Sequence, residues 1–237
     1  MVHVGDRPVV VDRRRTPRGE VVLRRAGEHF EVITNGTFLM DTRDGRSERA
    51  LVREAIAGKT GVRLLLAGLG VGFSLDEALG ADAVTEVVVV ELEAVVVEWV
   101  RTHLGGLTER GLGDPRVRLV VADIRDVLET TEDEFDAICL DIDNGPGWVV
   151  HEANTEVYGD ATLAVIDRRL RPGGRLAVWA AAPDPEFEAR LRRRFGEVAV
   201  VRVPVARGPD DVVYVATREA GPGRACAAQH APGRGRP

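Results

Sequence analysis

Two aspartates separated by one residue follow an apolar segment in the middle of the chain, in the sequence LDIDNGPGW at residues 140–148. The preceding residues, FDAICL, are typical of a buried strand, so Asp141 and Asp143 are expected at its carboxyl end. A simple turn needs only one Gly or Asx residue. Two carboxylates followed by Asn144 and a Gly-Pro-Gly loop therefore indicate a place where a positively charged group is handled.

A glycine-rich loop, LLLAGLGVGFS at residues 64–74, follows an earlier apolar strand. Gly68, Gly70 and Gly72 allow the backbone to approach a ligand closely and direct free N–H groups towards it. Dinucleotide and S-adenosylmethionine (SAM) sites both use such loops. The dinucleotide fingerprint requires a small residue three positions after the second glycine, where this chain has Phe73, so the loop favours a SAM-type ligand over NAD.

Two more acids end or follow the next two predicted strands. Glu91 ends VVVVE, where a carboxylate can accept hydrogen bonds from both ribose hydroxyls. Asp123 follows VRLVV, where the adenine amino group of a SAM-type ligand would lie. With Leu92 and Ile124 beside them, these acids predict an adenosine pocket, although each acid is also a plausible helix N-cap.

The composition restricts the classes of protein that the chain can represent. Its 237 residues are 44% hydrophobic and 30% charged, which suits one α/β domain with a small appendage. The net charge of -6 argues against a nucleic-acid partner. The two cysteines are expected to be free thiols in a reducing cytoplasm. The chain shows neither an apolar leader nor a run long enough to span a bilayer, so we expect no membrane association.

From residue 62 onwards, apolar strands alternate with helices, which predicts a doubly wound α/β fold with a mostly parallel, seven-stranded sheet of the class I methyltransferase type. The last two strands are joined only by ARGPDD and should form an antiparallel hairpin. The expected strands are 62–67, 86–91, 117–121, 135–141, 174–181, 197–204 and 212–217. The expected helices are 74–80, 93–104, 124–131, 155–170 and 184–195.

The chain before this region has the pattern of β-hairpins, with turn signals at Ala26-Gly27, Asn35-Gly36 and Asp44-Gly45. We therefore expect a small antiparallel β unit at residues 1–52 and a Rossmann-like SAM-binding domain at residues 53–218. The Pro/Gly-rich segment 219–237 is expected to be a disordered tail.

The order and spacing of these motifs resemble those of the spermidine synthase (polyamine aminopropyltransferase) family. The resemblance covers residues 62–180, from the glycine loop through VVVVELE, DPRVRLVVADIRDVL and FDAICLDIDNGPG to VYGDATLAVIDRRLRPGGRLAVW. Two details favour this family over ordinary methyltransferases. They are an aliphatic residue, Leu66, two positions before the first glycine of the loop and the segment GDPRV at 113–117.

The resemblance implies that Glu91 holds the ribose, that Asp123 lies at the adenine, and that Asp141 is the catalytic acid residue of the family's motif. It also implies homodimerisation through the small β unit. Three departures stand out. The second motif acid of the family falls on Asn144, and the acid that binds the amino group of decarboxylated SAM falls on Val71, so intact SAM becomes a plausible donor. The Gln and Tyr that line the family's polyamine pocket have no clear counterpart around FLMDTRDGRSERAL.

The loop after the fourth strand supplies the remaining candidates. Trp148 is expected either over the reacting centre, where its ring would stabilise a cation, or packed on the sheet. Asp143, Trp148 and His151 are assigned to a substrate pocket, with Asn144 and Tyr158 as catalytic candidates beside Asp141. No spacing of histidines with other ligands predicts a metal site.

These observations leave three reactions and one non-enzymatic role. The first is alkyl transfer from SAM or decarboxylated SAM to a small amine or amino acid, with Asp141 as base and methylthioadenosine as the leaving group. The second is intramolecular cyclisation of SAM to a small cyclic amino acid, such as 1-aminocyclopropane-1-carboxylate or azetidine-2-carboxylate, again with release of methylthioadenosine. The third is methyl transfer to a small molecule. A non-enzymatic, adenosyl-binding homologue remains the alternative.

Overall fold

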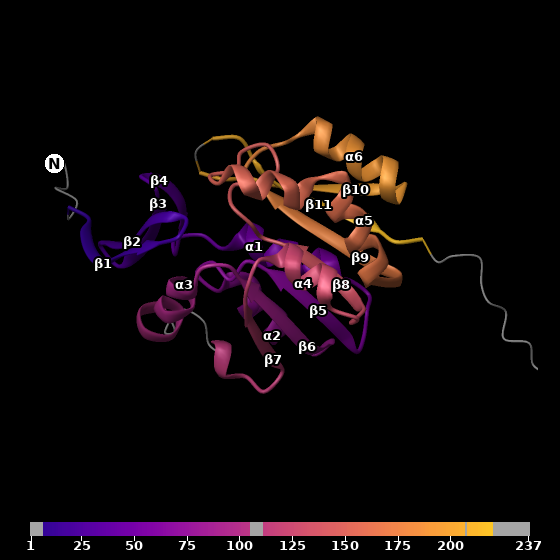
Figure 1. The fold of residues 1–237 in the computed structure, drawn as a ribbon, viewed down its shortest axis with the longest axis horizontal. Coiled ribbons are helices and arrows are strands. Elements are labelled where there is room, and N and C mark those ends of the chain that lie inside the picture. Colours follow the sequence, from indigo (N-terminus) through magenta and orange to yellow (C-terminus); the bar gives the residue numbers. More distant parts are fainter. Residues whose placement is uncertain (1–6, 105–110, 207, 220–237) are drawn as a thin grey trace, which may run out of the picture.

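The computed structural model describes residues 7–104, 111–206 and 208–219. Almost all of the expected tail, residues 219–237, and also Cys226 lie outside the described residues. Figure 1 shows a small sheet at the N-terminal end of the chain beside a larger α/β domain.

The small sheet is antiparallel, with strands in the order β1-β2-β3-β4. Its strands are β1 (Val9–Thr16), β2 (Gly19–Ala26), β3 (His29–Thr34) and β4 (Thr37–Asp41). Asn35, at a φ of 51°, and Gly36, at 82°, form the tight turn between β3 and β4. The predicted antiparallel β unit is confirmed.

The large sheet has the order β10-β11-β9-β8-β5-β6-β7. Its strands are β5 (Val62–Ala67), β6 (Val84–Glu91), β7 (Val117–Val121), β8 (Phe135–Leu140), β9 (Leu170–Ala180), β10 (Val198–Val203) and β11 (Asp211–Thr217). β10 pairs with β11, and β11 with β9, in antiparallel fashion, whereas the pairs among β7, β6, β5, β8 and β9 are parallel. The predicted fold class, including its antiparallel hairpin, is confirmed.

Within the described residues, six α-helices surround this sheet. They are α1 (Arg46–Ile56), α2 (Phe73–Gly80), α3 (Ala94–Trp99), α4 (Ile124–Thr130), α5 (Asp160–Arg169) and α6 (Pro185–Phe195). A π-helical turn at Val100–Leu104 continues α3, and short 3-10 helices lie at Gly111–Gly113 and Glu152–Tyr158.

Both faces of the sheet are covered, which explains why its strands read as continuous apolar runs. Leu64 and Leu66 belong to a core that includes residues of α1, α2 and α3. Leu65 and Ala67, on the opposite face, belong to a core that includes residues of α4, α5 and α6. Alternation along β5 thus divides a single apolar segment between two cores.

Helix α1 was not predicted. The Asp44-Gly45 pair, interpreted as a hairpin turn, instead precedes the first turn of this helix. The buried residues Leu51, Val52, Ala55 and Ile56 recur at helical spacing and pack into the core of the large sheet. The expected domain boundary after residue 52 therefore falls inside a helix.

Polar contacts hold the small sheet against the segment that follows β6. The Trp99 indole N–H donates to Asp12 at 2.9 Å. Arg18 donates to the Glu93 carboxylate at 2.8 Å and to the Leu92 carbonyl at 2.7 Å. The first hairpin therefore fixes the backbone next to Glu91.

The end of β5 lies against the residue that follows β8. The Asp141 N–H donates to the Ala67 carbonyl at 2.8 Å. Gly68 has a φ of 93°, and a Cβ placed there would lie 2.0 Å from the Asp141 carbonyl oxygen. Only glycine permits this approach, which brings the glycine loop to the Asp141 backbone.

We predict that Gly68→Ala destabilises the fold by roughly 2–5 kcal/mol, because it combines left-handed strain with overpacking against backbone. Gly27→Ala is the matched control, since Gly27 has a φ of 64° but a Cβ added there would meet no atom within 4 Å. It should cost only about 1–2 kcal/mol. Urea unfolding of both variants measures the difference, and equal losses would show that the contact with Asp141 imposes no constraint.

Candidate active site

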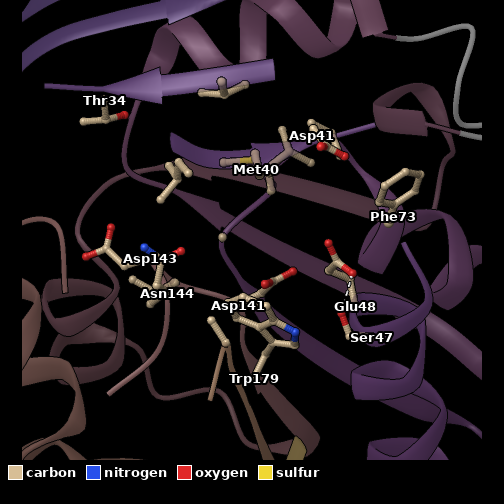
Figure 2. Close-up of a pocket in the computed structure, with 18 of the residues that line it drawn as sticks. Thr34, Met40, Asp41, Ser47, Glu48, Phe73, Asp141, Asp143, Asn144 and Trp179 are labelled. Atoms are coloured by element: carbon tan, nitrogen blue, oxygen red, sulfur yellow. Dashed lines mark hydrogen bonds between the residues drawn. The ribbon is translucent and has the colours of Figure 1, made fainter. Parts of the chain in front are cut away.

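A cavity of about 770 Å³ lies at the carboxyl ends of β5, β6 and β8. The β3–β4 hairpin, the start of α1 and the segment before β11 also line it. Figure 2 shows Thr34 and Met40 of the small sheet on one side, Trp179 of β9 on the other, and Asp141 between them. The walls are mainly apolar, and several acids, among them Asp141 and Glu91, interrupt them.

Most of the predicted site residues line this single cavity. Those that do are Gly68, Gly70, Glu91, Leu92, Asp123, Ile124, Asp141, Asp143, Asn144, Trp148 and His151. Gly72 lies just outside the lining, as the left-handed residue that precedes α2. Tyr158 does not line the cavity.

Glu91, at the end of β6, is almost fully buried at 8% exposed. One carboxylate oxygen accepts from the Leu69 N–H and the other from the Glu93 N–H, both at 2.8 Å. Burial raises the pKa of this carboxyl. A carboxylate has about four lone-pair positions, so each oxygen keeps the capacity to accept one more hydrogen bond from a ligand.

Asp123 is the N-cap of α4, because its side chain accepts from the Arg125 N–H at 2.9 Å. The Arg125 guanidinium also bonds to both carboxylate oxygens, and this contact lowers the pKa of Asp123. Asp123 therefore caps a helix, which is one of the two roles that the sequence indicated. The residue still faces the cavity, where the neighbouring Ile124 supplies an apolar surface.

Asp141 follows β8 at the centre of the lining. Its Oδ2 accepts from the Ser74 hydroxyl at 2.7 Å. Burial raises the pKa of Asp141 to about 6, with smaller contributions from the charges of Glu91 and Asp211, and the Ser74 hydrogen bond opposes the rise. Such a carboxylate is poised to exchange a proton near neutral pH.

Two further carboxylates reach this end of the cavity, and the sequence patterns indicated neither of them. Glu48 comes from the first turn of α1 and Asp211 from the start of β11. Figure 2 shows the Glu48 and Asp141 carboxyl groups on facing walls. Burial, together with the charge of Asp141, raises the pKa of Glu48 to about 7. An amphipathic helix pattern after Asp44 was the available signal for Glu48.

Asp143 holds the loop that follows β8. It has a φ of 52°, and its Oδ2 accepts from the Asn154 amide at 2.6 Å and from the Val150 N–H at 3.2 Å. It lines the cavity, but its main contacts are with its own loop. Asp143 thus lies in the lining, as expected for a pocket residue, and also holds its own loop.

Asn144 is buried, at 7% exposed, and lines the cavity beside Asp141. Its amide nitrogen has no hydrogen-bond partner among the described residues. An unpaired buried donor costs free energy unless a ligand or water satisfies it. Asn144 is therefore a group that a bound molecule would complete.

The two aromatic candidates, Trp148 and Tyr158, lie in different environments. Trp148 is 59% exposed and lines the cavity, so it is not packed on the sheet. Tyr158 is buried against Phe187, and its hydroxyl donates to the Ile142 carbonyl at 2.6 Å. Tyr158 therefore supports the backbone behind Asp141 and does not contact the cavity, contrary to its predicted catalytic position.

Neither a metal centre nor a membrane span is evident in residues 7–104, 111–206 and 208–219. In these ranges, no group of three His, Cys, Asp or Glu side chains has an arrangement that would hold a metal ion. No helix in the same residues is sufficiently long and apolar to cross a membrane.

Comparison with known proteins places this arrangement in a family. Residues 56–184, more than half of the chain, match the spermine/spermidine synthase domain. The polyamine aminopropyltransferase of Mycobacterium tuberculosis (strain H37Rv) is 30% identical over 178 residues, which are 73% of this chain and 33% of the relative. Polyamine aminopropyltransferase 2 of Streptomyces coelicolor is 32% identical over 216 residues, which are 88% of this chain and 37% of the relative. The matched region thus spans about a third of either relative.

Solved structures show the same fold. Spermidine synthase from Thermotoga maritima superposes with a TM-score of 0.72 at 16% identity, covering 89% of this chain and 73% of that one. A spermidine synthase in complex with the transition-state analogue AdoDATO gives a TM-score of 0.76 at 17% identity, covering 89% and 74%. With its glycine loop, its strand-end acids and a domain match across most of the parallel sheet, this chain belongs to the spermine/spermidine synthase domain family.

Proposed function

We propose that the protein transfers an alkyl chain from SAM or decarboxylated SAM to a small amine, releasing methylthioadenosine. The observation that carries this proposal is the position of Asp141, a half-buried carboxylate next to the glycine loop, in a cavity that is also lined by Glu91, Asp123, Glu48 and Asp211. The aminopropyltransferase names of the relatives support the same reaction class.

The reaction is a displacement at the γ carbon of the donor's sulfonium-bound chain. The amine nitrogen forms a bond to this carbon, the C–S bond breaks, and its electron pair stays on sulfur as neutral methylthioadenosine leaves. An alkylammonium with a pKa of about 10.4 is not nucleophilic, and its deprotonation at pH 7 costs about 4.6 kcal/mol. Asp141 orients the amine and accepts its proton as the new bond forms.

The donor lies with its ribose at Glu91 and its adenine near Asp123 and Ile124. Leu92 and the glycine loop enclose the nucleoside in this proposal. Val71 lines the cavity where the family's amine-binding acid would lie, so no carboxylate at that position selects against the carboxyl group of intact SAM. Both donors are therefore included.

The acidic end favours transfer to a separate amine over acceptor-free cyclisation. The amide of Asn144, where the family has an acid, cannot balance the charge of a diamine. Glu48 and Asp211 supply that negative charge from other elements. Cyclisation needs one base beside the donor, whereas three carboxylates suit a second, cationic substrate.

We expect Asp141→Asn to lower the rate of methylthioadenosine release roughly 10²–10⁴-fold, because the amide cannot accept the proton. Binding of methylthioadenosine should change little. In the wild type, the rate should fall as pH drops through about 6, where Asp141 becomes protonated. The rate of methylthioadenosine release is measured by chromatography of the products formed from each donor and an amine. If S-adenosylhomocysteine were the product instead, the reaction would be methyl transfer.

The control is Asp126→Asn, an exposed acid on α4 outside the cavity lining, which should retain wild-type turnover. If Asp141→Asn lost affinity for methylthioadenosine as strongly as it lost rate, the assignment of Asp141 as base would fail.

Glu91→Ala should weaken methylthioadenosine binding by about 3 kcal/mol, the value of two charge-assisted hydrogen bonds to the ribose. Because Glu91 also accepts two backbone N–H groups, Glu91→Gln is a second variant that keeps an acceptor and most of the volume. Titration calorimetry gives the affinities, with Glu86→Gln, at the opposite end of β6, as control. Unchanged binding in both Glu91 variants would remove the ribose assignment.

A further inference from the structure

A serine joins two carboxyl groups at the acidic end of the cavity. The Ser47 hydroxyl oxygen lies 2.9 Å from Oε2 of Glu48 and 2.7 Å from Oδ2 of Asp211. Ser47 and Glu48 begin α1, whereas Asp211 begins β11, 164 positions from Ser47. The fold therefore assembles this acid pair from the two ends of the domain.

Counting protons shows what this geometry requires. A serine hydroxyl has one hydrogen and can donate to only one of the two carboxyl groups. Its second short contact is a hydrogen bond only if the other carboxyl is protonated and donates to the serine oxygen. One proton held between Glu48 and Asp211 would therefore make both contacts hydrogen bonds.

The arginines of the described residues near this pair are engaged with other acids. Within the described residues, neither Glu48 nor Asp211 forms an ion pair. Of the arginines that line the cavity, Arg43 pairs with Glu31 and Asp41, and Arg46 pairs with Asp44. Arg49, also on α1, pairs with Asp76. Burial raises the pKa of Asp211 and raises that of Glu48 to about 7. The other titratable groups that raise these values through their charges are Asp141, Asp44 and Asp210.

A separate observation points to a ligand in the same cavity. Asn144, opposite Glu48 across Asp141 in Figure 2, has a buried amide nitrogen without a hydrogen-bond partner in the described part of the chain. An acid pair without a cation and an amide without an acceptor thus flank the proposed base. A cationic acceptor on one side and the donor on the other would satisfy both.

We propose that Glu48, Ser47 and Asp211 form a proton-holding acid pair that binds a second ammonium group of the acceptor and releases its proton when that group enters. The inference rests on the proposed function and makes Glu48 and Asp211 determinants of acceptor specificity. An amine with two ammonium groups gains both contacts, one at Asp141 and one at the pair. A monoamine of the same length gains only one.

The test is titration calorimetry of 1,4-diaminobutane and 1-aminobutane into the protein saturated with methylthioadenosine. At pH 6.5, in two buffers of different ionisation enthalpy, diamine binding to the wild type should release roughly one proton. The Glu48→Gln variant should release fewer protons when the diamine binds. It should also bind the diamine roughly 10–100-fold more weakly, because a charge-assisted contact is lost. Monoamine affinity should be the same in both proteins.

Glu54→Gln, the same change on the same helix but outside the cavity lining, should behave as the wild type. Asp211→Asn should reproduce the loss of diamine preference. Equal diamine affinity and equal proton release in the wild type and Glu48→Gln would overturn the inference, as would a wild type that does not prefer the diamine.

Unfolding provides a readout that does not depend on amine binding. A carboxyl whose pKa is raised in the folded state stabilises the fold at low pH, and this contribution is lost as pH rises through the folded-state value. For Glu48, the loss should extend from about pH 4.5 to about pH 7. Urea unfolding across this range should show a flatter pH dependence in Glu48→Gln than in the wild type, and identical slopes would contradict the stored proton.

Failure of the two proposals can be distinguished. If the wild type releases no methylthioadenosine from either donor with either amine, the proposed function is wrong. If methylthioadenosine is released but Glu48→Gln keeps the wild-type preference for the diamine, the function stands and the acid pair does not select the acceptor.

Discussion

Uncompensated negative charge at the carboxyl ends of β6 and β8 is the constraint from which the chemistry of this protein follows. Glu91 is buried and Asp141 is half-buried, and the pKa values of both rise because burial penalises the ionised form. Among the described residues, the hydrogen bonds that they accept come from backbone N–H groups and a serine, not from arginine or lysine. A cationic ligand would supply the missing counter-charge. The same carboxylates would then both bind the ligand and exchange protons with it.

The fold imposes this arrangement through backbone packing. Gly68 adopts a left-handed conformation against the Asp141 carbonyl, so the glycine loop and the backbone of the proposed base are held in contact. The apolar residues of β5 fill two cores, one on each face of the sheet, which fixes the strand that carries this loop. Arg18 then ties the small sheet to the Leu92 carbonyl next to Glu91. Rigid elements on three sides therefore position acids that would otherwise repel one another.

The sequence predicted the parts of the site that are local. Near-continuous apolar strands, each followed by a glycine or an acid, identify the carboxyl edge of a parallel sheet, and Glu91, Asp123 and Asp141 are found there. Glu48 and Asp211 could not be predicted in this way, because they enter the cavity from a helix and a strand that are distant in sequence. Helix α1 was also concealed by Asp44-Gly45, which follows two true hairpin turns and was interpreted as a third.

Local patterns also could not separate residues that face the cavity from residues that support it. Tyr158 lies in the same segment as His151, yet its hydroxyl turns to the Ile142 carbonyl, whereas His151 lines the cavity. Asp143 lines the cavity as Asp141 does, yet its carboxylate holds its own loop through Asn154. The difference depends on side-chain direction after a strand has ended, where the two-residue alternation no longer applies.

The position of the negative charge also bears on the proposed reaction. The acid expected after β8 is replaced by Asn144, and acids from α1 and β11 lie on the other side of Asp141. An acceptor drawn to Glu48 and Asp211 would approach Asp141 from the α1 side and leave the Asn144 side to the donor. An amide nitrogen donates hydrogen bonds, whereas an ionised carboxylate cannot. Asn144 therefore suits a hydrogen-bond acceptor on the SAM-type substrate, including the carboxylate of intact SAM. The exchange of acid for amide would then alter which donor is accepted while the acid pair maintains the attraction for the amine.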